Sequence, residues 1–342
     1  MELLMKLMDA HGVSGDEDEV RTIIEKEIKK YVDEVKIDKL GNLVAKQRGT
    51  KPRIMLAAHM DEIGLMVKDI MKNGKMRFST VGGIEPLLLV GQKVRIPTNK
   101  GTILGVITTK ELNDSHEIEN LPIISDLFVD TGLTQTQLIK LGIEPGNYMS
   151  PDEKPSYLGN QNIICGKALD DRIGCYVLIE LAKRVKKVKN EVYYVFTAQE
   201  EVGLFGAKAS AYEINPNWAV AVDATNANDC SSADYITKEI GKGPCISIKD
   251  ERMISNKKVV EMLKAAAKKR DIPLQLEVSN FGTTDAMNIS MTRGGVPTAT
   301  LSVAIRNLHS TISIAHTQDI EDAIEVLVEL LKNPPKLPVQ WR

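Results

Sequence analysis

The feature that most constrains the fold is a set of four continuous apolar runs that alternate with helical patterns. The runs lack the alternation of polar and apolar residues seen in half-exposed strands, and such runs are typical of strands buried on both faces. Strands that alternate with helices predict an α/β fold, with a mixed, largely parallel sheet covered by helices. The runs cover residues 53–58, 192–198, 218–222 and 298–304, and the predicted helices cover 3–9, 17–32, 171–186, 256–270 and 318–332.

Residues 68–162 do not follow this alternation. Turn signals such as Gly82-Gly83 and Asp130-Thr131-Gly132 separate short strand-like runs, and only one short helix is expected, near 134–141. A chain of 342 residues also exceeds the usual size of a single core. We therefore predict a small β-rich domain at 68–162, inserted into a main α/β domain made of 1–67 and 163–342. The strand-like runs are 75–81, 87–96, 101–109 and 126–130.

Charge and hydropathy exclude several classes of partner. A net charge of −2 gives no electrostatic reason to expect nucleic acid or an anionic membrane. No apolar stretch approaches the roughly 20 residues that span a bilayer. The first residues carry no cationic segment of a secretory signal, and the four cysteines show no paired spacing. We expect a cytoplasmic protein with reduced thiols.

Histidines and carboxylates follow the apolar runs closely. In open α/β sheets, ligands bind in the crevice outside the carboxyl ends of the strands. The chain has only five histidines, and two of them stand at such positions. The order of these side chains predicts a hydrolase with two metal ions. In chain order the set is His59, Asp61, Asp170, Glu200, Glu201, Asp223 and His309.

His59 and Asp61 form an H-x-D step directly after the first buried run. An extended chain returns every second side chain to the same face, so Asp61 is able to contact His59. A metal-bound histidine usually donates its other ring N–H to a carboxylate, which fixes the tautomer and raises the basicity of the ligand. The alternative is a histidine at a strand end with a solvated aspartate beside it.

Asp170 stands at the start of the predicted helix 171–186, where two interpretations compete. An aspartate at this position is a favourable N-cap. A carboxylate can also bridge two cations with its two oxygens, and the ions of two-metal hydrolases lie roughly 3.5–4 Å apart. We favour the bridge because of the other members of the set.

Glu200 and Glu201 end the apolar run 192–198. Adjacent side chains on an extended backbone point to opposite sides, so the two carboxylates are expected to have different roles. Glu201 is predicted to bind metal, and Glu200 to accept the proton of a metal-bound water whose pKa is about 7. The alternative is an exposed acidic turn.

Asp223 and His309 complete the set. Asp223 follows the run 218–222, and His309 lies five residues beyond the run 298–304. Taken alone, each has an ordinary structural explanation, a solvated strand end for the aspartate and a hydrogen-bonded surface residue for the histidine. Together with the others they give two histidines and three carboxylates as ligands, plus a base.

The same residues carry a resemblance to a known family. The chain resembles the tetrahedral (TET) aminopeptidases, also called glutamyl or deblocking aminopeptidases, which form metallopeptidase family forty-two in the clan of co-catalytic zinc exopeptidases. The resemblance covers nearly the whole chain, including the position of the inserted domain. The matching stretches are Ala57–Gly64 (AAHMDEIG), Ala168–Arg172 (ALDDR), Thr197–Gly203 (TAQEEVG), Gly282–Ala286 (GTTDA) and Arg306–Ser310 (RNLHS).

The resemblance implies a ligand set for two divalent metal ions in each subunit. His59 and Asp223 would hold one ion, Glu201 and His309 would hold the other, and Asp170 would bridge both. Zinc or cobalt is the ion expected in the family. The affinity order of divalent metals and the mixed set of imidazole and carboxylate agree with zinc.

The resemblance also implies an activity and an assembly. The expected activity is that of an aminopeptidase that removes N-terminal residues from peptides, with a metal-bridging water as nucleophile. Glu200 would be the general base and Asp61 the partner of His59. The inserted domain would mediate dimerisation, and dimers would build a hollow tetrahedron of twelve subunits.

Two other functions are compatible with the same residues. A related metal-dependent deacylase or carboxypeptidase would need a cation for the carboxylate of its substrate, and Arg293 or Arg306 could serve. A non-catalytic assembly subunit could retain metal for stability alone. The presence of Glu200 argues against this second alternative, because a structural site needs no general base.

Overall fold

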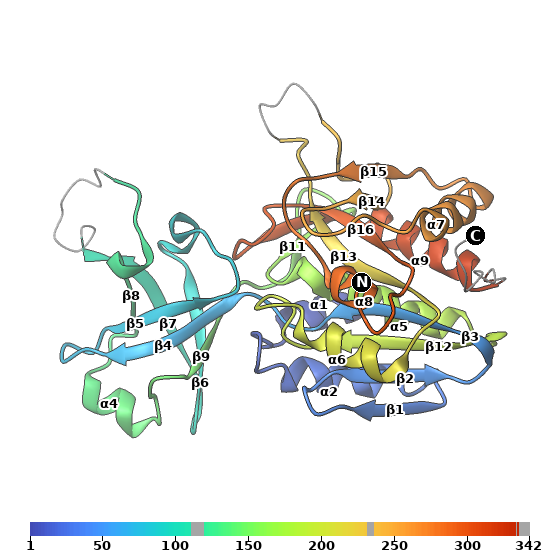
Figure 1. Cartoon of the computed structure of the whole chain (residues 1–342). Coiled ribbons are helices and arrows are strands. Elements are labelled where there is room, and N and C mark those ends of the chain that lie inside the picture. The colour runs from blue at the N-terminus through green and yellow to red at the C-terminus, as the bar shows by residue number, and fades with distance from the viewer. Residues whose placement is uncertain (111–119, 231–235, 333, 335–342) are drawn as a thin grey trace.

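The computed structural model describes residues 1–110, 120–230, 236–332 and 334. It consists of a large sheet covered by helices and a separate small barrel (Figure 1). The large sheet has eleven strands, in the order β1-β2-β12-β3-β13-β16-β17-β11-β10, with β14 paired to β16 and β15 to β14. The strands are β1 (Glu34–Ile37), β2 (Leu43–Gln47), β3 (Thr50–His59), β10 (Ser156–Tyr157), β11 (Ile163–Gly166), β12 (Asn190–Thr197), β13 (Trp218–Asn226), β14 (Cys245–Lys249), β15 (Gln275–Val278), β16 (Thr298–Arg306) and β17 (Ser313–His316).

The four central strands of this sheet are parallel. β12 pairs with β3, β3 with β13, and β13 with β16, all in parallel register. These are the four apolar runs of the sequence, and their side chains are almost all buried. The α/β fold with a mixed, largely parallel sheet is thus confirmed. In this register Thr197 lies beside His59 and Ala221 beside Ala57, so His59 and Asp223 come level at the carboxyl edge.

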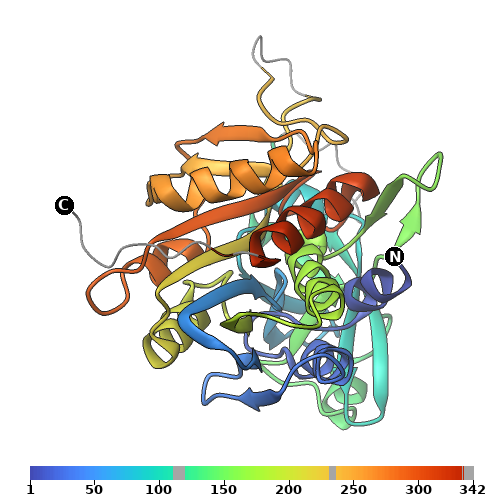
Figure 2. The same cartoon turned by 90° about the vertical axis from the view of Figure 1, so that its right-hand side faces the viewer.

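Helices cover both faces of the sheet (Figure 2). Their apolar sides pack into one extended core on the first face and a smaller cluster on the second, where Met55 and Ala219 meet Ala207 and Ile289. The first face carries α1 (Glu2–Asp9), α2 (Asp18–Ile28), α5 (Leu169–Arg184), α7 (Lys257–Lys269) and α9 (Thr317–Lys332), and the second carries α6 (Phe205–Ile214) and α8 (Asp285–Ser290).

The barrel closes through antiparallel pairs in the order β4-β5-β8-β7-β6-β9 and has its own apolar core, which includes Phe78 and Ile107. Its strands begin at Gly64 and end at Pro151, whereas β10 and β11 belong to the large sheet. The predicted bounds of the inserted domain, residues 68–162, remain a prediction. Its role in dimerisation also remains a prediction. The elements are β4 (Gly64–Ile70), β5 (Met76–Val81), β6 (Lys93–Thr98), β7 (Gly101–Thr109), β8 (Leu127–Asp130), β9 (Tyr148–Pro151), α4 (Gln135–Lys140) and the 3-10 turns η1 (Pro86–Leu89) and η2 (Ile124–Asp126).

Two predicted elements differ in detail from the structure. The run 87–96 was expected to be one strand, but it begins as the 3-10 turn η1 and becomes strand only at Lys93. Pro86 has a fixed φ and no N–H to donate, and both properties favour a turn over a ladder. The strand that contains Asp223 continues to Asn226, so this carboxylate lies within β13 and not beyond its end.

A buried group of charges ties the first helix to the segments that carry the candidate site. The ammonium of Lys167 lies 2.6 and 2.8 Å from the two carboxylate oxygens of Glu62 and donates to the carbonyl of Ala10 at 2.8 Å. The guanidinium of Arg172 donates to the carbonyl of Leu7 at 2.6 Å and lies 3.4 Å from Glu62. All three charged side chains are almost completely buried. They fix the chain just after His59 against the start of α5.

Replacing Lys167 by Met is expected to lower the free energy of unfolding by about 3–5 kcal/mol, because Glu62 then stays buried without its main cation. Urea unfolding of the metal-free chain measures the effect. The matched control is Lys183→Met, which removes an exposed pair with Glu180 and is expected to cost about 0–1 kcal/mol. Equal losses in the two variants would contradict a stabilising role for the buried pair.

Candidate metal centre

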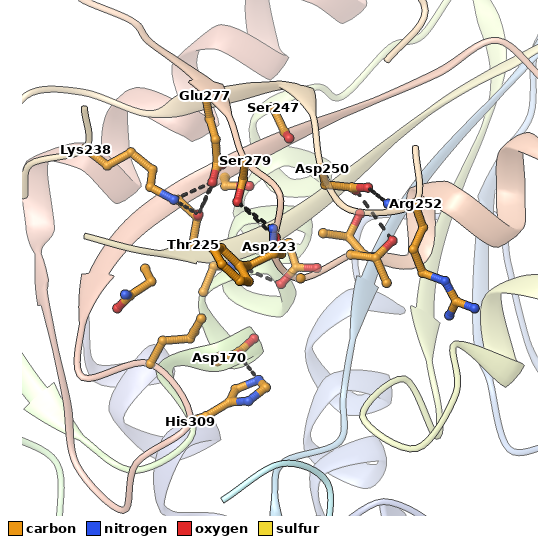
Figure 3. Close-up of a pocket in the computed structure, with 18 of the residues that line it drawn as sticks. Asp170, Asp223, Thr225, Lys238, Ser247, Asp250, Arg252, Glu277, Ser279 and His309 are labelled. Atoms are coloured by element: carbon orange, nitrogen blue, oxygen red, sulfur yellow. Dashed lines mark hydrogen bonds and ion pairs between the residues drawn. The ribbon is translucent and has the colours of Figure 1, made fainter. Parts of the chain in front are cut away.

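A cavity of about 790 Å³ opens at the carboxyl edge of the central strands (Figure 3). It is bounded by segments that follow β12, β13 and β16 and by residues of β14 and β15. Six of the seven predicted site residues line it, and Asp61 lies buried behind them. The six are His59, Asp170, Glu200, Glu201, Asp223 and His309.

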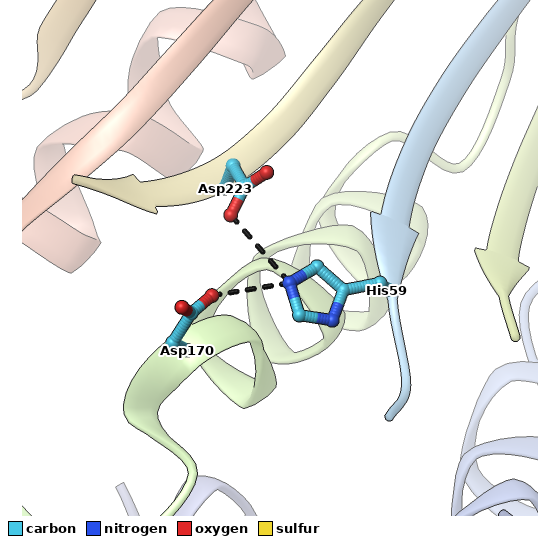
Figure 4. A group of neighbouring side chains, drawn as sticks. All are labelled: His59, Asp170 and Asp223. Carbon is cyan, nitrogen blue, oxygen red and sulfur yellow. Dashed lines mark hydrogen bonds and ion pairs between the residues drawn. The ribbon is translucent and has the colours of Figure 1, made fainter. Parts of the chain in front are cut away.

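The first group of potential ligands is His59, Asp170 and Asp223 (Figure 4). His59 is the last residue of β3, and its Nε2 lies 3.1 Å from Asp170 Oδ1 and 3.7 Å from Asp223 Oδ1. One ligand atom from each residue lies within 4.8 Å of the other two. The three side chains therefore converge on one point, as metal ligands do.

The second group is Asp170, Glu201 and His309. Nε2 of His309 lies 3.5 Å from Asp170 Oδ2 and 3.5 Å from Glu201 Oε2. Glu201 comes from the loop after β12, and His309 from the loop after β16, where its φ of 55° turns the chain sharply. The two groups share only Asp170.

Asp170 is oriented differently from a helix cap. Its φ and ψ of −83° and 111° are not helical, and each of its oxygens faces a different group. The neighbouring Asp171 performs the capping instead, since its Oδ1 accepts the N–H of Gly174 at 2.9 Å. The other oxygen of Asp171 accepts the N–H of His59 at 3.2 Å. Asp170 is thereby left facing the cavity with both oxygens.

The backbone of Asp61 fixes the imidazole of His59. Nδ1 of His59 lies 3.0 Å from the Asp61 carbonyl oxygen, whereas the nearest carboxylate oxygen is 3.6 Å away. A carbonyl oxygen only accepts, so Nδ1 carries a proton, and Nε2, which faces Asp170 and Asp223, is the nitrogen that would bind a metal ion. The predicted contact is present, but the carbonyl makes the closer approach.

The carboxylate of Asp61 instead holds the loop that carries the two glutamates. It accepts the N–H of Glu200 at 3.0 Å, the N–H of Glu201 at 3.1 Å and the hydroxyl of Ser14 at 2.5 Å. Asp61 thus connects His59 to both glutamates through separate atoms. Sequence spacing could not show this second contact, because it depends on how the loop after β12 folds back.

The candidate ligands form a crowded, largely acidic cluster, and this crowding shifts their pKa values. Burial, together with repulsion from Asp170, raises the pKa of Glu201 to about 8, and burial raises that of Asp223 to about 6. Hydrogen bonding to Asp170 raises the pKa of His309 to about 9. Against the effect of burial, His309 and His59 hold the pKa of Asp170 well below its usual range. Buried carboxylates of this density require compensating cations or protons.

The donor atoms fit divalent metal ions. Imidazole nitrogen and carboxylate oxygen are ligands of zinc and related transition metals. The carboxylate of Glu200 is also buried beside this set, and burial raises its pKa well above the usual range, with further repulsion from Asp223 and Asp285. Such a carboxyl group is able to hold a proton near neutral pH.

The turn that follows β5 in the barrel lies beside the second group. A Cβ atom at Gly83 would lie 3.3 Å from Nδ1 of His309, and one at Gly82 would lie 3.3 Å from Oε2 of Glu201. Gly82 has a φ of +79°, which other residues rarely adopt. The turn that follows β5 can therefore approach the ligands only because it carries no side chains.

The two arginines considered for a substrate carboxylate lie outside the cavity lining. Arg306 pairs with Asp229 at 2.8 Å. Arg293 stacks over the ring of Tyr212 at 4.0 Å. Neither is placed to bind a substrate beside the ligands.

Sequence reasoning assigned no role to Asp285, which the structure places in the layer behind the ligands. The side chain is buried at the start of α8, where Oδ2 accepts the hydroxyl of Thr197 at 2.5 Å. Within the described part of the chain, Oδ1 has no hydrogen-bond partner. Burial raises the pKa of Asp285 to about 7. Its position in the matching stretch Gly282–Ala286 was the available signal.

None of the helices in the described ranges is long and apolar enough to cross a bilayer.

Comparison with known proteins gives consistent matches along the chain. Residues 41–326 match the family model described as M42 glutamyl aminopeptidase. A putative aminopeptidase of Acetivibrio thermocellus is 38% identical over 96% of this chain and 98% of its own length. The lysyl aminopeptidase of Pyrococcus furiosus is 35% identical over 97% of this chain and 96% of its own length.

Solved structures agree with these matches. A TET aminopeptidase from a marine sediment archaeon of the Thaumarchaeota has a TM-score of 0.93 and 36% identity, and the match covers 98% of this chain and 96% of that one. The TET1 peptidase of Pyrococcus horikoshii, described as assembling into a tetrahedron or a large octahedral shell, has a TM-score of 0.87 and 33% identity, with coverage of 96% and 98%. With its fold and the order of its site residues, this chain belongs to the M42 glutamyl aminopeptidase family and is a peptide hydrolase.

Proposed function

We propose that the chain is a dinuclear-metal aminopeptidase that removes N-terminal residues from peptides. The observation that carries the proposal is the orientation of Asp170, whose two oxygens face two separate ligand groups. His59 and Asp223 would hold one ion, Glu201 and His309 the other, and Asp170 both.

The metals are proposed to be zinc or cobalt, because two imidazoles and three carboxylates suit ions of this class. When bound, two such ions supply a water of lowered pKa, about 7, and polarise the carbonyl of the scissile peptide bond. The chain itself would supply the orientation of the ligands and the proton transfer.

Glu200 is proposed as the general base. It lies in the same cavity as the ligands, and burial together with repulsion from Asp223 raises the pKa of its carboxyl group, which makes its ionised form a stronger proton acceptor. Its carboxylate would accept one proton from the attacking water and deliver that proton to the nitrogen of the leaving amine. The peptide C–N bond breaks, and the products are a free amino acid and a peptide shorter by one residue.

Asp61 is proposed as a positioning residue with two functions. Its carbonyl fixes the tautomer of His59, and its carboxylate fixes the backbone of Glu200 and Glu201. A mutation of such an outer partner typically costs 10–100-fold in metal affinity or activity.

Asp61→Asn is therefore expected to lower kcat/KM by about 10- to 100-fold, because an amide cannot accept from both backbone N–H groups and from Ser14 at once. The measurement combines peptide hydrolysis with the zinc concentration that restores half of the activity. Asp69→Asn, a change of the same kind on the barrel surface, is the control and is expected to change neither. If Asp61→Asn hydrolysed peptides at the wild-type rate and needed the same zinc concentration, Asp61 would have no positioning role in the site.

The alternative of a deacylase or carboxypeptidase is less well supported, because Arg293 and Arg306 are engaged outside the cavity. The test compares one peptide with a free amino terminus and the same peptide with an acetylated one. We expect the zinc- or cobalt-loaded chain to release free amino acids in order from the first peptide only. Release from the carboxyl end, or removal of the acetyl group, would favour the alternative.

We also propose self-association through the inserted residues 68–162 into dimers and then a dodecamer, as the tetrahedral assembly of the Pyrococcus horikoshii relative suggests. Exposed apolar side chains on the barrel, among them Leu87, Leu104 and Val106, support a buried surface there. Light scattering would measure the mass of the particle. A cytoplasmic location is proposed as well, and the four free cysteines agree with it.

A further inference from the structure

Beyond the candidate ligands, the cavity extends over a wall that contains both acidic and basic side chains (Figure 3). We call this surface the distal wall. It comes from the end of β13, from β14 and β15, and from the segments that follow them. Its charged members are Lys238, Asp250, Arg252 and Glu277, and its polar members include Thr225, Ser247 and Thr283.

One acid of the distal wall is already neutralised. Glu277 forms an ion pair with the ammonium of Lys238, and its two oxygens lie 3.2 and 3.1 Å from the hydroxyl of Thr225. The same ammonium lies 3.0 Å from that hydroxyl. Lys238 and Glu277 therefore cancel each other's charge and leave neither free for a charged ligand.

The second acid, Asp250, has no cationic partner. The residue is only 8% exposed, and its Oδ1 accepts the backbone N–H groups of Arg252 and Met253 at 2.8 and 2.7 Å. The other oxygen has one weak contact, the hydroxyl of Thr283 at 3.5 Å. Within the described ranges, no lysine, arginine or histidine side chain forms an ion pair with it. Burial raises the pKa of Asp250, as expected for a carboxylate without a cation.

The nearby cations are directed elsewhere. The ammonium of Lys249 donates to the carbonyls of Asp250 and Ser279, both at 3.0 Å, and to the side chain of Asn280. Arg252 is exposed, and Figure 3 shows its guanidinium turned away from the carboxylate of Asp250. The distal wall thus presents one uncompensated and largely buried negative charge to the cavity.

We propose that the distal wall selects peptides whose N-terminal residue is basic, lysine or arginine, and that Asp250 binds the ammonium or guanidinium of that side chain. The inference rests on the proposed aminopeptidase function, since the substrate's first side chain enters the same cavity as the scissile bond. A few well-placed polar groups in a pocket fix the identity of its ligand. Charge-assisted hydrogen bonds are the strongest of these contacts.

The other classes of side chain fit this wall poorly. An N-terminal glutamate would bring a second negative charge against Asp250. A leucine would displace water from the carboxylate without replacing its hydrogen bonds, and an unsatisfied buried charge is costly. Thr283, which contacts Asp250, and Ser247 on the same wall offer hydroxyl oxygens that suit an ammonium group better than a methyl group.

The experiment measures kcat/KM of the zinc-loaded chain with the p-nitroanilides of lysine, arginine, leucine and glutamate. Lysine and arginine are expected to exceed leucine and glutamate by at least about 10-fold, the lower end of what a hydrogen bond to a charged group contributes. Asp250→Asn keeps the shape and the acceptor for the two backbone N–H groups. It is expected to lower the values for lysine and arginine by about 10- to 100-fold and to leave leucine within about 3-fold.

Two further variants make the test specific. Glu251→Gln removes an exposed charge from the next residue, which does not line the cavity, and is expected to change no substrate. Arg252→Gln removes an exposed cation of the wall, the only one among its described residues, and is expected to keep the preference for basic residues. A wild-type preference for glutamate that is lost in Arg252→Gln, or an equal effect of Asp250→Asn on all four substrates, would overturn the proposal.

A binding measurement separates this inference from the proposed function. Calorimetry with the zinc-loaded Glu200→Gln chain and the dipeptides Lys-Ala, Leu-Ala and Glu-Ala is expected to show tightest binding of Lys-Ala, weakened by an added Asp250→Asn change. Selective binding without any hydrolysis by the wild-type chain would support the basic site and refute the aminopeptidase. Hydrolysis without selectivity would support the aminopeptidase and refute the basic site.

Discussion

Replacing Glu200 by Gln is expected to lower kcat for release of an N-terminal residue by about 100- to 10,000-fold, the contribution typical of a positioned general base. Glutamine has nearly the same shape but cannot accept a proton from water. The side chain lies in the cavity and outside both groups of potential ligands. The metal content of the variant is therefore expected to equal that of the wild type. Steady-state kinetics and metal analysis of the same preparation measure the two quantities.

Glu213→Gln is the matched control for this change, because it removes a carboxylate that is exposed on α6. It is expected to keep both activity and metal. If Glu200→Gln retained its metal and hydrolysed peptides at the wild-type rate, Glu200 would not be the base. A wild-type chain that binds metal without hydrolysing any peptide would instead favour the non-catalytic assembly subunit.

Asp170→Asn is expected to have an effect of similar size for a different reason. Both oxygens of the aspartate face candidate ligand groups, Oδ1 toward His59 and Oδ2 toward His309. An asparagine has one oxygen and one NH2 group, and the NH2 group cannot act as a ligand. We expect zinc content to fall below two ions per chain, and activity to fall by more than the 10- to 100-fold that loss of an outer partner costs.

The control for Asp170→Asn, and the result that would contradict the prediction, both concern the number of metal ions bound per chain. Asp69→Asn on the barrel is expected to retain two ions per chain. His309→Ala removes a ligand of the second group only, so it is expected to retain one tightly bound ion. Full metal content in Asp170→Asn would contradict a bridging carboxylate and would leave two independent single-metal sites as the better description.

The central sheet was predictable because burial on both faces leaves a continuous apolar run in the sequence, as in β3 and β16. The shorter elements left no comparable signal. The strands β14 and β15 have five and four residues and exist through their pairing with β16 and with each other. The helices α6 and α8 are short, and α6 buries mainly small residues without a strongly amphipathic pattern.

The candidate site was predictable in its members but not in its contacts. Position after an apolar run, together with the order of the residues, predicted a set of candidate ligands and Glu200, and the structure brings these residues together at one cavity. Spacing alone could not assign the helix cap to Asp171 in place of Asp170, since both precede the same helix. It also could not show that His59 contacts the carbonyl of Asp61, because loop dihedral angles decide which atom approaches.

The role proposed for Asp250 could not be predicted from the sequence, because it too depends on contacts made only in the folded chain. It follows a strand, as many exposed aspartates do, and nothing in its neighbours marks it as buried. Its role depends on two facts of packing, the pairing of Lys238 with Glu277 and the direction of Arg252. Both are decided by segments distant in sequence that meet only in the folded chain.

A zinc titration of the metal-free wild-type chain tests the central claim most directly. The chain is stripped with a chelator, zinc is added in known equivalents, and the release of the N-terminal amino acid from a peptide with a free amino terminus is followed. We expect no release without zinc and a maximum at two equivalents per chain, with an acetylated peptide left intact throughout. Undiminished hydrolysis by the stripped chain, or a maximum at one equivalent, would contradict a dinuclear aminopeptidase centred on Asp170.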